Sequence, residues 1–213
     1  MNVFGTLLGP GELDRLFREG TVHGLRALAG RKRSVTSTES GVPIAYYRFV
    51  PPVRTASTPS CKIFLFDQDL PVAVASFLER GVVPAVVTLE LAGFAPHMNA
   101  ADSTARAGDA IDATVAFTLE KPTAIEWLRA LAWLRLAFPP ETRVLARWDL
   151  LGPSLTQLSL DYGVDEIAGP RRLLRSHQEA SAASPYGGLS EPEVRSLIVR
   201  GRRQPTRVKE EPV

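Results

Sequence analysis

Short apolar runs alternate with segments of helical periodicity through the middle of this chain, and this alternation limits the folds that it can adopt. The runs rich in β-branched and aromatic residues are 42–50, 61–66, 82–91, 113–119, 143–150 and 164–168. The segments between them with helical spacing of apolar residues are 70–80, 122–138 and 153–162. Strands that alternate with helices are typical of a parallel sheet covered by helices. We therefore predict an α/β fold, either an open parallel sheet or a partial barrel.

Helices are predicted at both ends of this core. Residues 11–29 have helical spacing, and Gly20 and Gly24 are expected to divide that helix in two. Near the other end, Ser190 and Glu193 have the spacing of a capping box at the start of a helix over 190–200.

The length of the chain, 213 residues, suits one sizeable core. We predict a single α/β domain over residues 1–213. It consists of an N-terminal helical segment (1–33), an α/β core (34–169), and a linker with a C-terminal helix and tail (170–213).

The bulk composition excludes several classes of protein. No apolar run approaches the roughly 18–20 residues of a membrane span, and the N-terminus lacks the pattern of a secretory signal. The net charge of +2 is too small to indicate nucleic acid by itself. A single cysteine suits a reducing compartment, so the cytoplasm is the expected location.

The run from Ile125 to Arg207 contains an ordered series of residues that points to one enzyme group. These residues are Trp148, Leu151, Gly152, Pro153, Leu155, Gln157, Gly163, Val164, Asp165, Glu166, Gly169, Leu189, Ser190, Glu193, Leu197, Ile198, Pro205 and Arg207. The series resembles the C-terminal part of the radical-SAM group that contains dehypoxanthine futalosine cyclase and aminofutalosine synthase of menaquinone biosynthesis. The synthase of the deazaflavin cofactor chromophore belongs to the same group. The resemblance implies a partial or reduced TIM-like (βα) barrel of parallel strands, with N-terminal and C-terminal helices.

The chain departs from that group at two places. Radical-SAM chemistry needs three thiolates to hold a four-iron cluster that binds SAM, whereas this sequence has one cysteine, Cys61, which we interpret as a buried inert thiol. Arg171 and Arg172 follow the last predicted strand, where the group usually carries acidic residues. The resemblance therefore implies an ancestry and a pathway, while these residues disfavour an iron–sulfur cluster, SAM and the radical reaction. No cofactor is predicted.

Five residues of the matched run are candidate ligand-binding residues, namely Gly152, Pro153, Gln157, Asp165 and Gly169. Gly152 and Pro153 form a strand-to-helix turn whose free N–H groups suit an anion, and Gln157 lies one turn further on. Gly169 ends the last predicted strand, at the edge where barrels bind ligands. Asp165 and Glu166 lie at the entry to that strand, and the alternative interpretation of this acid pair is a solvated turn or a carboxylate that anchors a helix.

A weaker candidate site for a metal consists of Asp67 and Asp69, which directly follow a predicted strand. The competing interpretation makes Asp69 the N-cap of the next helix. The three histidines, His23, His97 and His177, have no metal-type spacing. No catalytic residue is assigned.

Three hypotheses follow for function. The first is a cluster-less relative of the futalosine-pathway enzymes, a pseudoenzyme that binds a small polar ligand or a partner enzyme. The second is an interaction or scaffold module whose arginine-rich end docks a full-length paralogue. The third is an unrelated small α/β enzyme that uses Asp67 and Asp69 with a divalent metal. No membrane partner is expected, and the C-terminal arginines lack interleaved aromatic residues, so nucleic acid is disfavoured.

Overall fold

The computed structural model describes ten stretches of the chain, and every structural statement below concerns these residues. They are 9–32, 41–50, 61–63, 71, 74, 78–79, 83–91, 112–117, 122–172 and 186–208.

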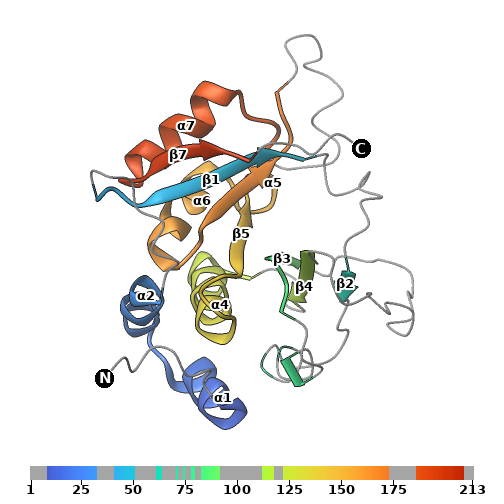
Figure 1. Ribbon diagram of the computed structural model, residues 1–213, viewed down its shortest axis with the longest axis vertical. Coiled ribbons are helices and arrows are strands. Elements are labelled where there is room, and N and C mark those ends of the chain that lie inside the picture. Colours follow the sequence, from blue (N-terminus) through green and yellow to red (C-terminus); the bar gives the residue numbers. More distant parts are fainter. Residues whose placement is uncertain are drawn as a thin grey trace.

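Seven strands form one sheet in the order β2-β4-β3-β5-β6-β1-β7 (Figure 1). The strands are β1 (Ile44–Phe49), β2 (Cys61–Ile63), β3 (Val86–Leu91), β4 (Asp112–Phe117), β5 (Arg143–Arg147), β6 (Glu166–Gly169) and β7 (Gln204–Arg207). Every pairing between neighbouring strands is parallel. The predicted α/β fold with a parallel sheet is therefore confirmed.

The helices agree with the sequence pattern, with two additions. They are α1 (Pro10–Glu19), α2 (Val22–Arg31), α4 (Ala124–Ala137), α5 (Trp148–Leu151), α6 (Pro153–Ser159), the 3-10 helix η2 (Leu160–Tyr162) and α7 (Glu191–Arg200). The predicted break is present at Gly20, whereas Gly24, which was also expected to break the helix, lies inside α2. The predicted capping box of α7 is present. The short α5 was not predicted, and neither was the capping box that Thr123 and Glu126 form at the start of α4.

The described helices pack on one face of the sheet. The strand residues that share a hydrophobic cluster with α4, α5 and α7 are Ala45, Tyr47, Val87, Leu89, Val144, Ala146 and Ile167. Because side chains alternate along a strand, the residues between them point to the opposite face. A smaller cluster of buried side chains on that face, Val86, Leu145 and Ala168, comes entirely from strands.

The strand order differs from the sequential order of a closed barrel. The late strand β6 pairs with the early strand β1, and a barrel is closed by a pairing of this kind. On the other side of β1, however, lies β7, which the sequence pattern did not predict. Its ends are held where Gln204 N–H donates to Pro43 O and Val208 N–H donates to Tyr47 O, both at 2.9 Å. Among the described strands, β2 and β7 are the two edges of an open sheet.

Trp148 fills the carboxyl end of the sheet on the face that carries the helices. Its side chain is fully buried, and the indole N–H donates to Pro170 O at 3.3 Å. The ring meets Phe49 edge to face, with 5.9 Å between centroids. It also lies so close to Gly169 that a Cβ at this position would overlap the indole. This position of β6 therefore requires glycine.

Replacing Gly169 by alanine should lower the free energy of unfolding by about 1–3 kcal/mol, because the added Cβ meets a close-packed indole. Gly30→Ala is the matched control. A Cβ there meets no atom, and alanine favours helix α2 by up to about 1 kcal/mol over glycine. Urea unfolding measures both changes. A Gly169→Ala variant as stable as the wild type would contradict the described packing of Trp148.

Candidate functional site

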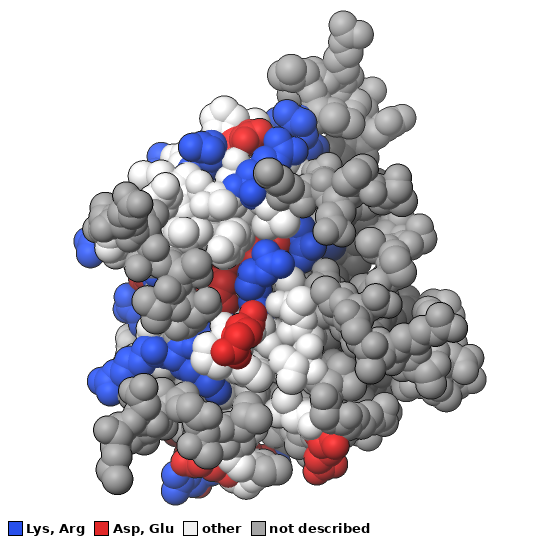
Figure 2. Space-filling view, viewed as in Figure 1, with Lys and Arg blue, Asp and Glu red and all other residues white. Residues whose placement is uncertain are grey.

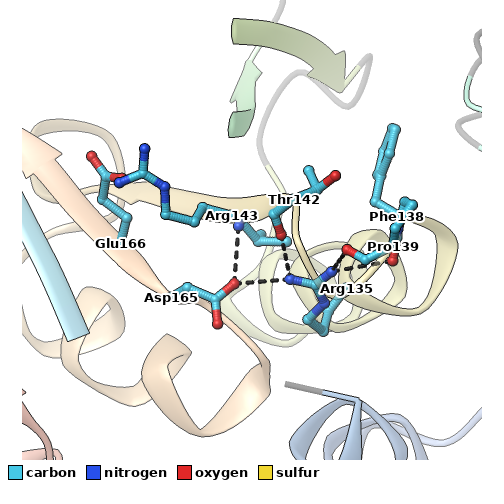
Figure 3. A network of polar contacts seen from close by, with 8 residues as sticks. Arg135, Phe138, Pro139, Thr142, Arg143, Asp165 and Glu166 are labelled. Atoms are coloured by element: carbon cyan, nitrogen blue, oxygen red, sulfur yellow. Dashed lines mark hydrogen bonds and ion pairs between the residues drawn. The ribbon is translucent and has the colours of Figure 1, made fainter. Parts of the chain in front are cut away.

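A buried ion pair joins α4 to the strands β5 and β6 (Figure 3). Arg135, on the last turn of α4, is fully buried, and its Nη1 lies 2.9 Å from Oδ2 of Asp165. The same guanidinium donates to the backbone oxygens of Thr142, at 2.5 Å, and of Phe138, at 3.1 Å, and it also donates to Pro139 O. It therefore satisfies carbonyl groups where the chain leaves the helix.

Asp165 completes this network from the strand side. Besides the bond from Arg135, its Oδ2 accepts the N–H of Val144 at 3.2 Å. Burial lowers the pKa of Arg135 from its ordinary value, and the charge of Asp165 opposes that shift. Asp165 is therefore a structural carboxylate that anchors helix α4, which is one of the alternative interpretations of this residue given above.

The next residue, Glu166, projects to the opposite face of the sheet, as Figure 3 shows. Its carboxylate is fully buried and forms ion pairs with Arg48 Nε at 2.5 Å and with Arg143 Nη1 at 2.9 Å. Those two arginine side chains are 23% and 30% exposed, so they reach solvent. The guanidinium of Arg143 also lies 5.4 Å from the ring centroid of Tyr46. A buried acid is thus held between two partly exposed cations.

A third arginine stands at the carboxyl end of β5. Arg147 donates to Asp149 twice, from Nε to Oδ1 at 2.9 Å and from Nη2 to Oδ2 at 2.7 Å. Both side chains are buried, and the two parallel bonds fix the plane of the guanidinium. In the register of the sheet, Arg147 and Arg48 flank Ala168 from the two neighbouring strands.

We call these five residues, Arg48, Arg143, Arg147, Asp149 and Glu166, the charged strand face. Three cations and two acids leave it with one excess positive charge. Guanidinium groups in fixed planes match carboxylates and phosphates, which accept two parallel N–H bonds. The arrangement suits a small anion. Of its members, the sequence pattern singled out only Glu166, as part of the matched run, and none of the three arginines or Asp149.

The five sequence candidates do not form one site. Gly152 and Gly169 both lie at the carboxyl end of the sheet, where Gly152 N–H donates to Trp148 O at 2.9 Å and Gly169 lies under the indole. A Cβ at Gly152 would come within 2.9 Å of the Tyr186 ring, so the ring covers this turn. Asp165 lies at the opposite end of β6.

The remaining two candidates belong to α6, a helix of seven residues. Pro153 is its first residue, and the side chain of Gln157 is half-buried. Asp67 and Asp69 lie outside the described residues. Within the described part of the chain, no group of three His, Cys, Asp or Glu side chains is close enough to hold a metal ion.

Lys32 is a buried cation that the sequence pattern did not separate from its exposed neighbour Arg31. It is 8% exposed, and its Nζ donates to Leu136 O near the end of α4. Burial, together with the nearby charge of Arg135, lowers the pKa of Lys32 to about 8, against the weaker opposing effect of Glu141. The protonation state of Lys32 therefore changes just above neutral pH.

Comparison with protein-family models and with curated proteins finds no match for this chain. Among the described helices, none has both the length and the apolar character that crossing a membrane requires.

Asp165→Ala should destabilise the chain by about 3–5 kcal/mol, because it leaves the charge of Arg135 buried without its carboxylate. The control is Asp161→Ala, which removes the exposed pair with Arg26 and should cost about 1 kcal/mol or less. Chemical unfolding of the two variants compares them directly. Equal losses would mean that the buried pair contributes no more than a surface pair.

Lys32→Met should remove a pH-dependent contribution to stability. The pKa of Lys32 falls from 10.5 to about 8 on folding, so the unfolded chain binds more protons between these values. The stability of the wild type should therefore rise with pH across this window, by up to about 3 kcal/mol relative to Lys32→Met. Unfolding by urea at a series of pH values measures the difference. Arg31→Met, at the exposed neighbour, should keep the wild-type slope, and the same slope in Lys32→Met would contradict the assignment.

Proposed function

We propose that this protein is a cluster-less relative of the futalosine-pathway radical-SAM enzymes and that it binds a small anionic ligand on the charged strand face. The observation that carries the binding part is the buried Glu166 between Arg48 and Arg143, on the face opposite the described helices. A carboxylate or phosphate is the ligand group that suits these cations.

The geometry supports ligand binding more than a purely structural use of the charges. Burying a carboxylate is costly, and an apolar residue would cover a sheet face more cheaply. Here Glu166 pairs with two arginines, Arg48 and Arg143, whose side chains are both partly exposed. Arg147, buried and paired with Asp149, lies next to Arg48 across Ala168, at the end of β5.

The order of the elements supports the proposed ancestry. The run that resembles the radical-SAM group forms α4, β5, α5, α6, η2, β6, α7 and β7, so it alternates strands with helices and contains the C-terminal helix that the resemblance implied. The pairing of β6 with β1 is the type that closes a barrel. We propose that the chain retains a reduced barrel around β5, β6 and β1, and that β7 occupies the outer side of β1.

The proposed role lies in menaquinone biosynthesis in the cytoplasm and does not include the radical reaction. The single cysteine of the sequence cannot supply the three thiolates of the cluster. The residues of the charged strand face would bind and orient the ligand, with Glu166 setting the spacing of Arg48 and Arg143.

Isothermal titration calorimetry with dehypoxanthine futalosine, the substrate that names the cyclase of the group, tests the proposal. We expect binding at one site per chain. Arg48→Gln and Arg143→Gln should each weaken it about tenfold, equivalent to about 1.4 kcal/mol, because each removes one charge-assisted contact. The control Arg172→Gln alters an exposed arginine that pairs with Glu193, and it should bind as the wild type does.

Benzoate and inorganic phosphate serve as generic anions in the same experiment. If they bind while dehypoxanthine futalosine does not, the proposal of an anionic ligand is supported and the proposed role in menaquinone biosynthesis is wrong. If none of the three binds, or if the two glutamine variants bind as tightly as the wild type, the charged strand face is not a ligand site.

A further inference from the structure

A groove of about 840 Å³ runs along the outer side of α7 and is bounded by Arg171. It lies on a different part of the molecule from the charged strand face, since its walls come from α7 and from the residue that follows Pro170. Lys and Arg side chains gather at this end of the molecule in Figure 2, around α7 and the neighbouring strands.

The helix α7 is buried on one side and open on the other. Val194, Leu197 and Ile198 pack into the core. Pro192, Arg195 and Val199 lie at i, i+3 and i+7 on the opposite stripe and line the groove. Val199 is 59% exposed, which leaves an apolar side chain in contact with solvent between charged neighbours.

Three arginines, Arg171, Arg195 and Arg200, line the groove. Two of them are oriented by aromatic side chains of β1. Arg171 lies 5.4 Å from the Phe49 ring centroid, and Arg195 Nη1 lies 3.4 Å from the Tyr47 hydroxyl.

The acid that lines the groove, Glu191, is already engaged. It accepts from Tyr47 Oη at 2.7 Å, and it pairs with Arg207 at 3.5 Å. Among the described lining residues, the groove therefore presents a surplus of positive charge beside an exposed apolar side chain.

We infer that this groove docks an acidic segment of a partner protein. The segment would place carboxylates against Arg171, Arg195 and Arg200 and one apolar side chain over Val199. Charge complementarity of this kind steers association and fixes the register of the bound segment. A nucleic acid fits less well, since none of the described lining residues is aromatic and its bases would find no side chain to stack on.

Fluorescence anisotropy with a short labelled peptide of glutamate and leucine tests the inference. The wild-type chain should bind this peptide at low salt and should lose about tenfold in affinity when the salt is raised to screen exposed charges. Arg200→Glu should weaken binding, and the double variant Arg195→Glu/Arg200→Glu should weaken it at least about tenfold, because each change replaces attraction by repulsion. Arg15→Glu, which reverses one exposed charge on α1, should bind as the wild type does.

Two further probes complete the experiment, a peptide of lysine and leucine and a labelled DNA duplex. Weak or undetectable binding of both supports the inference. The inference is overturned if the double variant keeps the affinity of the wild type, if the lysine peptide binds equally well, or if the duplex binds more tightly and displaces the acidic peptide. Circular dichroism confirms that each variant is folded. Because no residue of the charged strand face is altered, these outcomes are independent of those for the small ligand.

Discussion

The buried contact between Arg135 and Asp165 holds the helical layer of this protein on its sheet. Desolvating a guanidinium costs several kcal/mol, and here a carboxylate and backbone oxygens at the end of α4 offset that cost. Helix α1 packs on α4, where the indole N–H of Trp133 donates to Leu13 O at 2.8 Å. The position of α1 therefore also depends on the contact between Arg135 and Asp165, which holds α4 on the sheet.

Two consecutive acids, Asp165 and Glu166, point to opposite faces of the sheet and form different ion pairs there. Asp165 turns toward α4 and completes the structural pair, while Glu166 turns away and holds Arg48 and Arg143. This alternation is the ordinary geometry of a strand. Here it places a charged cluster opposite the described helices and gives the proposed ligand site its position. Any change that shifts the register of β6 would exchange the two acids and disrupt both faces.

Much of the fold was predictable because its elements carry local patterns. The helix α4 and the capping box of Ser190 and Glu193 both appear where the sequence placed them. The strand β7 was missed because its residues are polar and it is held by backbone pairing with β1, which no local pattern reveals.

The candidate site was less accessible to sequence reasoning, because ion pairs join residues far apart in the chain. Arg48 and Arg147 interrupt apolar strand runs, and a charged residue within such a run is the pattern that could have singled them out.

The most direct test of the proposed ligand site is a crystal structure of the chain grown with dehypoxanthine futalosine. We predict ligand density with an anionic group within hydrogen-bonding distance of Arg48 or Arg143. Density only elsewhere on the chain, with these two arginines unchanged, would contradict the proposed site.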